Sequence, residues 1–203
     1  MKINIIGDGS FGTFLKKELP NYGFEICIYS SSVIFAVPFH AYDEVARSCS
    51  IRSDIKDWHF INVCSIQQPS TDILLKYTDK VTSIHPLFGA RTPVDKRNSI
   101  LTYWDDNEDT CEFLELFGNF SKILEIDPET GSFYDIESHD RLMAKTHAAA
   151  VLAAKQAKHF VDAAADIPDE LIPNSFRLLR EFVKTLDDMP SGTVESIMAN
   201  PYI

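Results

Sequence analysis

The start of the chain restricts its fold more strongly than any other segment. Residues 2–6 form a short apolar run, and glycines follow at positions 7, 9 and 12 in the pattern G-x-G-x-x-G. Residues 10–19 then have the pattern of a helix that begins on this turn. A strand, a glycine-rich turn and a helix in this order predict the first unit of a Rossmann-like fold, in which the turn holds the pyrophosphate of a dinucleotide.

Each glycine of the turn has its own expected role. Gly7 allows the tight turn, Gly9 lets a pyrophosphate approach the backbone, and Gly12 lets the helix pack closely on the strand. The alternative interpretation is a tight strand–helix turn that binds nothing. We predict that cofactor contacts come from this turn and from the ends of two later runs, namely Gly7, Asp8, Gly9, Ser10, Phe11, Gly12, Ser30, Val37 and Pro38.

The composition argues against several classes of partner. The 203 residues carry a formal net charge of −11, which disfavours binding to nucleic acid or to an anionic membrane surface. Four widely spaced cysteines, three of them in or beside apolar runs, predict buried free thiols and a reducing cytoplasm. From the sequence we expect no signal peptide, no membrane span and no metal site.

The first 127 residues alternate apolar runs with amphipathic segments, which predicts an α/β domain with a mostly parallel sheet. Strands are expected at 2–6, 33–37, 59–64, 81–85, 99–103 and 122–126, and helices at 10–19, 40–49, 70–77 and 108–118. Residues 128–203 predict a small all-α domain with helices at 138–165, 175–187 and 192–199. We expect the long, Ala-rich helix to pair with a second copy in a homodimer.

The connection that follows the second apolar run is too short for two full-length strands. An apolar run at 24–29 is separated by only three serines from the run at 33–37. Two full parallel strands on opposite sides of the first strand would require a span of about 20 Å, whereas residues 30–32 reach at most about 14 Å. We therefore predict a remodelled edge or connecting loop at 21–32, with little support for adenosine. The absence of a carboxylate there slightly favours NADP over NAD.

Two polar side chains stand at the ends of later strands. Ser65 follows the strand predicted at 59–64, and His85 ends the one at 81–85. Because ligands of open α/β sheets lie outside the carboxyl ends of the strands, the glycine turn, Ser65 and His85 are expected to share one crevice. A histidine at this place suits a general base, although it is also compatible with a side chain that is simply hydrogen-bonded to backbone.

Several motifs, in order along the chain, resemble the prephenate/arogenate dehydrogenase family. Besides the glycine turn they are A-V-P at 36–38, V-C-S-I at 63–66, S-I-H-P-L-F-G at 83–89 and E-S-H-D-R-L at 137–142. The closing segments F-R-L-L-R at 176–180 and T-V-E-S-I-M-A-N-P at 193–201 are also similar to that family. The resemblance implies a Rossmann domain, a helical dimerisation domain, and NAD(P)-dependent oxidative decarboxylation of prephenate or arogenate in tyrosine biosynthesis.

The resemblance also implies roles for individual residues. His85 would take the proton of the substrate's ring hydroxyl, and Ser65 would orient His85 or that hydroxyl. The anionic substrate would be bound by His147 and by a basic helix face made of Arg177, Arg180 and Lys184. His139 and Asp140 are interpreted as features of a helix N-terminus, where the dipole favours Asp.

Two other functions remain open at this point. A non-catalytic dimeric relative with a degenerate cofactor site would act as a binding or regulatory protein, and the missing adenosine half favours it. An NADP-dependent reductase of another small carbonyl or imine is the third possibility. Retention of Ser65 and His85 favours the dehydrogenase.

Overall fold

The computed structural model describes residues 1–51, 55–125 and 135–203. Its centre is a seven-stranded sheet in the order β2-β1-β3-β4-β5-β6-β7. Neighbouring strands are parallel except for β5 and β6, which are antiparallel, so the predicted α/β fold with a mostly parallel sheet is confirmed. The strands are β1 (Lys2–Ile6), β2 (Glu25–Ile26), β3 (Ser32–Phe35), β4 (His59–Asn62), β5 (Val81–Pro86), β6 (Asn98–Tyr103) and β7 (Lys122–Leu124).

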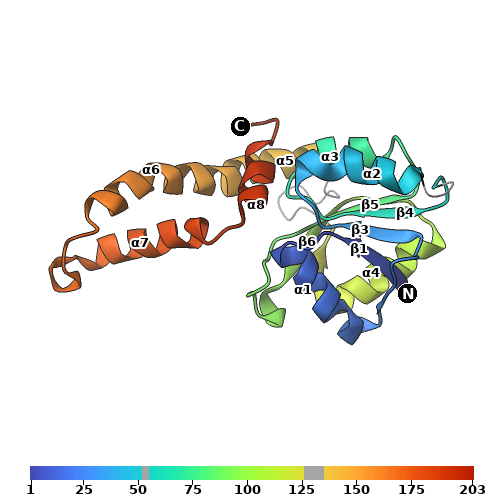
Figure 1. Cartoon of the computed structure of the whole chain (residues 1–203), viewed down its shortest axis with the longest axis horizontal. Helices are drawn as coiled ribbons and strands as arrows, with labels where there is room; N and C mark the ends of the chain where they lie inside the picture. The colour runs from blue at the N-terminus through green and yellow to red at the C-terminus, as the bar shows by residue number, and fades with distance from the viewer. Residues whose placement is uncertain (52–54, 126–134) are drawn as a thin grey trace.

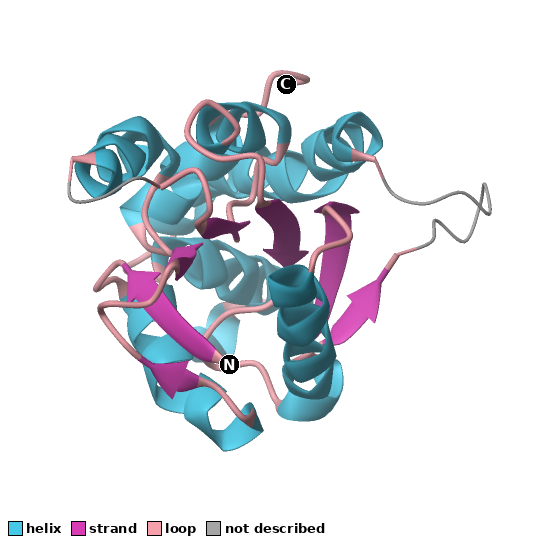
Figure 2. Cartoon of the chain, turned by 90° about the vertical axis from the view of Figure 1, so that its right-hand side faces the viewer, coloured by secondary structure: helices cyan, strands magenta, loops and turns pink. Residues whose placement is uncertain are grey.

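Helices cover both faces of the sheet, with α1 and α4 on one face and α2 and α3 on the other (Figures 1 and 2). Their ends agree with the predicted ones to within three residues, as expected when ends are read from hydrophobic patterns. The helices of this domain are α1 (Ser10–Glu18), α2 (Tyr42–Ser50), α3 (Gln68–Leu74) and α4 (Glu108–Phe120).

The core has two halves, one on each side of the sheet. Val33 and Phe35 of β3 belong to the cluster under α2 and α3, whereas Ile34 belongs to the cluster under α1 and α4. All three side chains are fully buried. A parallel strand that is buried on both faces has a continuous apolar sequence, which is why β3 can be recognised from the sequence alone.

The second strand is reduced to two residues. It pairs with Lys2 and Ile3 of β1, and β3 begins on the other side of β1 with Val33 opposite Asn4. Because β2 ends near the level at which β3 begins, residues 27–31 cross only two strand spacings, about 10 Å, and the chain does not run back. The predicted remodelled edge is therefore confirmed, and β2 stops short of the carboxyl end of β1.

A helical hairpin follows the sheet and extends away from it (Figure 1). The helix predicted at 138–165 is continuous in the structure but contains a π-helical turn. It consists of α5 (Ile136–Met143), the π segment Ala144–Ala148 and α6 (Ala149–Ala163). Next, α7 (Asn174–Asp187) packs along α6, and α8 (Ser191–Met198) lies next to the sheet domain.

Three further predictions concern the domain boundary, the cysteines and membrane-spanning helices. The domain boundary near residue 127 lies outside the described residues. Cys49 and Cys64 are buried, whereas Cys27 is half-buried in the segment after β2 and Cys111 is exposed, so fewer buried thiols are found than the pattern predicts. Among the helices that the structure describes, none is both long and apolar enough to cross a lipid bilayer.

Candidate functional site

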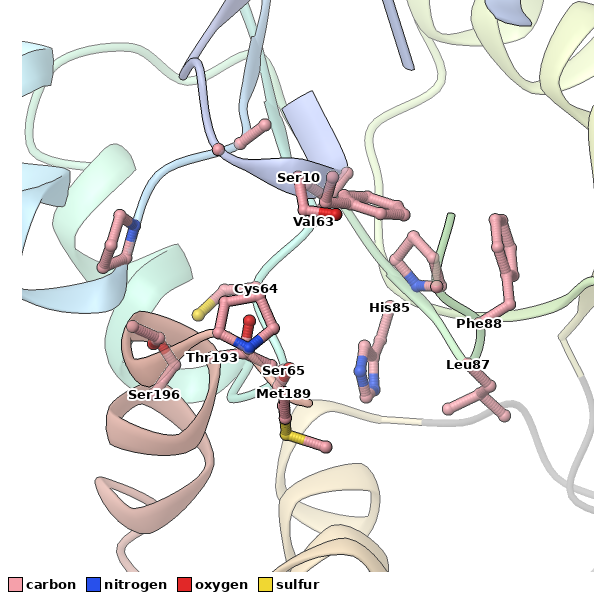
Figure 3. A pocket seen from close by; sticks show the side chains of 18 of the residues that line it. Ser10, Val63, Cys64, Ser65, His85, Leu87, Phe88, Met189, Thr193 and Ser196 are labelled. Atoms are coloured by element: carbon pink, nitrogen blue, oxygen red, sulfur yellow. The ribbon is translucent and has the colours of Figure 1, made fainter. Parts of the chain in front are cut away.

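A cavity of about 770 Å³ opens at the carboxyl ends of the parallel strands. It is lined by the glycine turn, by the ends of β3, β4 and β5, by the α5–α6 segment and by the start of α8 (Figure 3). It lies between the sheet and the helical part, at the edge where open α/β sheets bind ligands. The structure thus brings the glycine turn, Ser65 and His85 into one crevice, as the sequence predicts.

The three glycines of the turn have different surroundings. Gly7 has a φ of +129°, and a Cβ atom there would lie 2.1 Å from the carbonyl oxygen of Ala36. A Cβ atom at Gly12 would lie 2.3 Å from the carbonyl oxygen of Gly7, so both positions are fixed by backbone packing. At Gly9, which borders the cavity, a Cβ atom would meet no atom within 4 Å. The turn therefore leaves open space where a phosphate group would approach.

The N-terminus of α1 forms one wall of the cavity. Ser10 and Phe11, its first two residues, line the cavity, and the N-cap residue Gly9 has no side chain to satisfy the first N–H groups. Such N–H groups and the helix dipole attract anions. Val37 and Pro38, at the end of β3, line the same cavity. These groups fit the phosphate and nicotinamide portions of a dinucleotide.

Four of the residues predicted to contact the cofactor lie outside the cavity lining, namely Gly7, Asp8, Gly12 and Ser30. The Asp8 carboxylate lies 2.7 Å from the Lys16 ammonium group, which lowers the pKa of Asp8. Ser30 is buried, and its hydroxyl donates to the carbonyl oxygen of Lys2 at 2.9 Å while accepting from the Ser32 N–H at 3.1 Å. The structure therefore places the Ser30 hydroxyl in the crossing after β2, bonded to backbone.

His85 stands at the end of β5 and reaches into the cavity (Figure 3). It is only 2% exposed, and its Nδ1 atom lies 2.9 Å from the Nε2 atom of His139. Burial holds the pKa of His85 well below its usual value, and the neighbouring His139 and His147 lower it further. The ring is therefore neutral near pH 7 and can accept a proton.

His139 and Asp140 connect α5 to two parts of the sheet domain. The Nδ1 atom of His139 lies 2.9 Å from Oδ1 of Asp140, and the Asp140 carboxylate accepts the backbone N–H groups of Gln67 at 2.8 Å and Gln68 at 2.9 Å. Both side chains are fully buried. Their interpretation as a helix N-terminal feature is wrong, because α5 begins at Ile136 and the pair packs inward.

His147 lies in the π-helical segment and lines the cavity. Its ring stacks on that of His85, with centroids 6.2 Å apart and an interplanar angle of 21°. Burial is the main cause that lowers the pKa of His147, and His139 contributes. A π turn is uncommon and frequently marks a functional site. The structure thus brings His147, predicted as a substrate contact, directly beside His85.

Ser65 lines the cavity just after β4 and is half-buried. Within the described residues, the hydrogen-bond partner of the His85 ring is His139 and not Ser65. The expected role of Ser65 in orienting His85 is therefore not supported by a hydrogen bond in this structure and stays a prediction. Contact with a substrate hydroxyl stays a prediction.

The predicted basic helix face lies away from the cavity of its own chain. Arg177 donates to the carbonyl oxygen of Asp169 at 2.8 Å, and Arg180 pairs with the Asp169 carboxylate at 2.9 Å. These contacts hold the start of α7 to the connector after α6, at the outer end of the hairpin (Figure 1). Lys184 is exposed farther along α7. One chain therefore does not bring these three cations to His85.

The cavity lining has a distinctive charge pattern. Among the residues that the structure describes there, none has a carboxylate, ammonium or guanidinium side chain. The polar groups are hydroxyls, histidine rings and backbone N–H groups. The described ranges also contain no cluster of three or more His, Cys, Asp or Glu residues that could hold a metal ion. The side chains present are thus suited to hydrogen bonding and proton transfer.

Comparisons with known proteins identify the fold. No protein-family model and no curated protein sequence matches the chain, but solved structures do. The prephenate dehydrogenase of Aquifex aeolicus, solved with hydroxyphenyl propionate and NAD+, superposes with a TM-score of 0.63 over 98% of this chain and 82% of its own, at 15% identity. The chain has the fold of a prephenate dehydrogenase.

Two more structures show the same prephenate dehydrogenase fold. Synechocystis arogenate dehydrogenase has a TM-score of 0.62, covers 98% of this chain and 84% of its own, and is 14% identical. A Corynebacterium glutamicum protein, provisionally described as a prephenate dehydrogenase, has a TM-score of 0.65 over 97% of this chain and 73% of its own, also at 14% identity. The resemblance predicted from the motifs is therefore confirmed at the level of the fold, across the sheet domain and the helical part.

Proposed function

We propose that the chain is an NAD(P)-dependent dehydrogenase that oxidatively decarboxylates prephenate or arogenate. The observation that carries this proposal is the position of His85, a buried neutral imidazole in the same cavity as the open face of Gly9. A proton acceptor beside an anion-binding turn is the arrangement that the oxidation of a hydroxyl requires. The fold shared with prephenate and arogenate dehydrogenases supports this reaction class.

The cavity suits one half of the cofactor better than the other. Gly9, Ser10 and Phe11 would hold the pyrophosphate, and Val37 and Pro38 would border the nicotinamide side. The two-residue β2 offers little support for adenosine, and no carboxylate follows it. We therefore expect weak binding with a slight preference for NADP. When bound, the dinucleotide supplies the hydride acceptor.

His85 would supply the base for the reaction. Its free ring nitrogen would accept the proton of the ring hydroxyl. The O–H bonding pair would form the C=O bond as the C–H bond at the same carbon breaks, with the hydride passing to the nicotinamide of the bound dinucleotide. Departure of the carboxylate as CO₂ then makes the ring aromatic. General-base catalysis of this kind contributes about 10²–10⁴-fold to a rate.

The negative charge of the substrate needs a source of cations outside the cavity lining. We propose that a second copy of the chain supplies it, through a homodimer formed by the helical part. Leu171 and Leu178 are 73% and 58% exposed, and both lie near the outer end of the hairpin that carries Arg177 and Arg180. In the proposed homodimer we expect a partner to cover these apolar side chains and α7 of one copy to approach the cavity of the other.

The reaction is tested by following NADH or NADPH fluorescence during incubation with prephenate and, separately, with arogenate. We expect cofactor reduction with one of the two substrates. The matched control, His85→Asn, keeps a polar side chain of similar reach and should lose at least about 10²-fold in kcat. Turnover that persists in this variant would exclude His85 as the base, and no turnover with any pair would exclude the proposed reaction.

The cofactor is tested separately by calorimetry. Titration of the purified protein with NAD and with NADP should give weak binding, with NADP the tighter ligand. Absence of heat with either dinucleotide at millimolar concentration would contradict an intact pyrophosphate and nicotinamide site.

The second candidate function is a non-catalytic binding or regulatory protein, favoured by the shortened β2. In that case a small anionic ligand would bind in the cavity while neither dinucleotide is reduced. Binding of prephenate without turnover, together with an unaffected His85→Asn variant, would favour this candidate over the dehydrogenase.

A further inference from the structure

A continuous line of hydrogen bonds runs from the backbone at the start of α3 through α5 to the cavity. The Asp140 carboxylate accepts from Gln67 and Gln68 at 2.8 and 2.9 Å, His139 lies 2.9 Å from that carboxylate, and His85 lies 2.9 Å from His139. The three side chains of Asp140, His139 and His85 are at most 2% exposed. Neither His139 nor Asp140 lines the cavity, and their hydrogen-bonded connection to it runs through His85.

The donors and acceptors along this line determine where each hydrogen lies. The Nδ1 atom of His139 faces a carboxylate oxygen, which can only accept, so the hydrogen is on that nitrogen. A neutral imidazole has one donor and one acceptor, which makes Nε2 of His139 an acceptor. The Nδ1 atom of His85 faces this acceptor and therefore carries the hydrogen, which leaves Nε2 of His85 unprotonated.

We propose that His139 and Asp140 are positioning residues that hold His85 in the tautomer whose free Nε2 faces the cavity. His85 is thereby set as a proton acceptor in the resting protein and not as a donor. What Nε2 accepts rests on the proposed function, whereas the tautomer itself does not. When Nε2 gains a proton, the bond from Nδ1 to His139 becomes charge-assisted and stronger, with the Asp140 carboxylate behind it.

This support matters because the other surroundings of His85 oppose a charged ring. Burial disfavours the imidazolium form, and the neighbouring rings of His139 and His147 lower the pKa of His85 further. Among the described residues, the carboxylate that is connected to His85 by hydrogen bonds is Asp140, through His139. We call the hydrogen-bonded line Asp140–His139–His85 the relay. Without the relay, His85 would be free to place its hydrogen on either ring nitrogen.

The tautomers can be measured without any substrate. Long-range proton–nitrogen NMR spectra of the full chain, labelled with ¹⁵N-histidine, distinguish a protonated from an unprotonated ring nitrogen at each of the six histidines. Single histidine variants assign the signals of His85 and His139. We expect both rings in the Nδ1–H form at neutral pH. A hydrogen on Nε2 of His85 in the wild-type protein would overturn the proposal.

Two variants at one position provide a matched comparison. In His139→Gln the amide oxygen can replace the Nε2 acceptor, so His85 should remain in the Nδ1–H form. In His139→Leu this acceptor is lost, and the His85 signals should show a mixture of tautomers or the Nε2–H form. Circular dichroism of each variant checks that the fold is retained. Identical His85 tautomers in the two variants would show that His139 has only a packing role.

Asp140→Asn extends the test along the relay. With its amide oxygen in the place of Oδ1, this variant can still accept from His139 and Gln67, so both rings should keep the hydrogen on Nδ1. A shift of the His139 hydrogen to Nε2 with no change at His85 would contradict the coupling of the two rings. Because Asp140 also binds two backbone N–H groups, the pair of variants at His139 decides the question if this variant does not fold.

Activity gives an independent readout once a substrate is known. His139→Leu should lower kcat by about tenfold or more while KM changes less than about threefold, and His139→Gln should retain most of the activity. If the tautomers are as expected but no dehydrogenase activity is found, the proposed function fails and the relay stands. If activity is found and both variants at His139 retain it fully, the relay fails and the function stands.

Discussion

Gly192 packs directly on the ring of Pro38, so that a Cβ atom at position 192 would lie 2.7 Å from Pro38 Cγ. Both residues line the cavity, and the contact joins α8 to the segment after β3. A second contact lies beside it, where the Phe39 N–H donates to Ser196 Oγ at 3.1 Å. The shape of the cavity therefore depends on how closely α8 approaches the sheet domain.

The first prediction is that Gly192→Ala pushes α8 away from Pro38. The added methyl group meets a ring that cannot move aside cheaply, and overpacking of this kind costs about 1–3 kcal/mol. For a chain of this length we expect a fall in Tm of roughly 3–10 °C. Thermal unfolding followed by circular dichroism measures it. Gly89→Ala is the control, since a Cβ atom there would meet nothing within 4 Å, and an equal loss in both variants would contradict the prediction.

A second prediction separates the two kinds of glycine in the turn. Gly12→Ala places a methyl group 2.3 Å from a backbone oxygen and should destabilise the fold by about 3 kcal/mol. Gly9→Ala meets no protein atom and should change the free energy of unfolding by less than about 0.5 kcal/mol. It should weaken dinucleotide binding by about tenfold or more, because the methyl group occupies the space a phosphate would enter. Calorimetry showing unchanged affinity for Gly9→Ala would indicate that the turn binds no phosphate.

A third prediction concerns acid stability and His59, which lies in the core of the sheet domain. Desolvation lowers the pKa of His59 to about 4, and its Nε2 atom lies 2.8 Å from Thr82 Oγ1. In the unfolded chain His59 binds a proton near pH 6.5, whereas in the folded protein it stays neutral down to about pH 4. His59 therefore does not destabilise the fold above pH 6.5, and it destabilises the fold increasingly as the pH falls toward 4. The free energy of unfolding should therefore be about 2 kcal/mol lower at pH 5 than at pH 7 because of His59.

The measurement is urea unfolding of wild type and His59→Gln at pH 7 and pH 5. The amide of Gln can keep a hydrogen bond with Thr82 without binding a proton. The loss of unfolding free energy between the two pH values should be about 2 kcal/mol smaller in the variant. His85 and His147 also have lowered pKa values, but they are present in both proteins and cancel in the difference. Equal losses would mean that His59 is not a buried neutral histidine.

The fourth prediction tests the proposed homodimer. Phe160 and Leu178 are 63% and 58% exposed on the helical hairpin, and a partner would cover such side chains. Sedimentation equilibrium should give the mass of two chains for wild type and of one chain for the double variant Phe160→Lys/Leu178→Lys. Val94→Lys, at an apolar position of the sheet domain that is 51% exposed, should remain dimeric. A monomeric wild type at micromolar concentration would contradict the dimer.

Much of the fold can be predicted from the sequence because its signals are local. The strand–turn–helix at residues 2–19 and the buried strand at 32–35 are set by glycine spacing and continuous apolar runs. The shortened second strand can also be predicted, because residues 30–32 are too few to connect two full-length strands on opposite sides of the first strand. The π turn at Ala144–Ala148 has no comparable local signal, because it depends on how α5 and α6 each pack on their neighbours.

The candidate site likewise has a part that can be predicted from the sequence and a part that cannot. The sequence by itself determined that Ser65 and His85 end neighbouring strands near a glycine turn, because parallel strands deliver their ends to one edge. The hydrogen bond from His85 to His139, 54 residues farther along, and the bond from His139 to Asp140 depend on how α5 packs on the sheet domain and could not be predicted from the motifs. The tertiary structure also placed Arg177 and Arg180 at the far end of a hairpin. Contacts between distant segments depend on how helices pack, and the spacing of residues along a single helix carries no information about that packing.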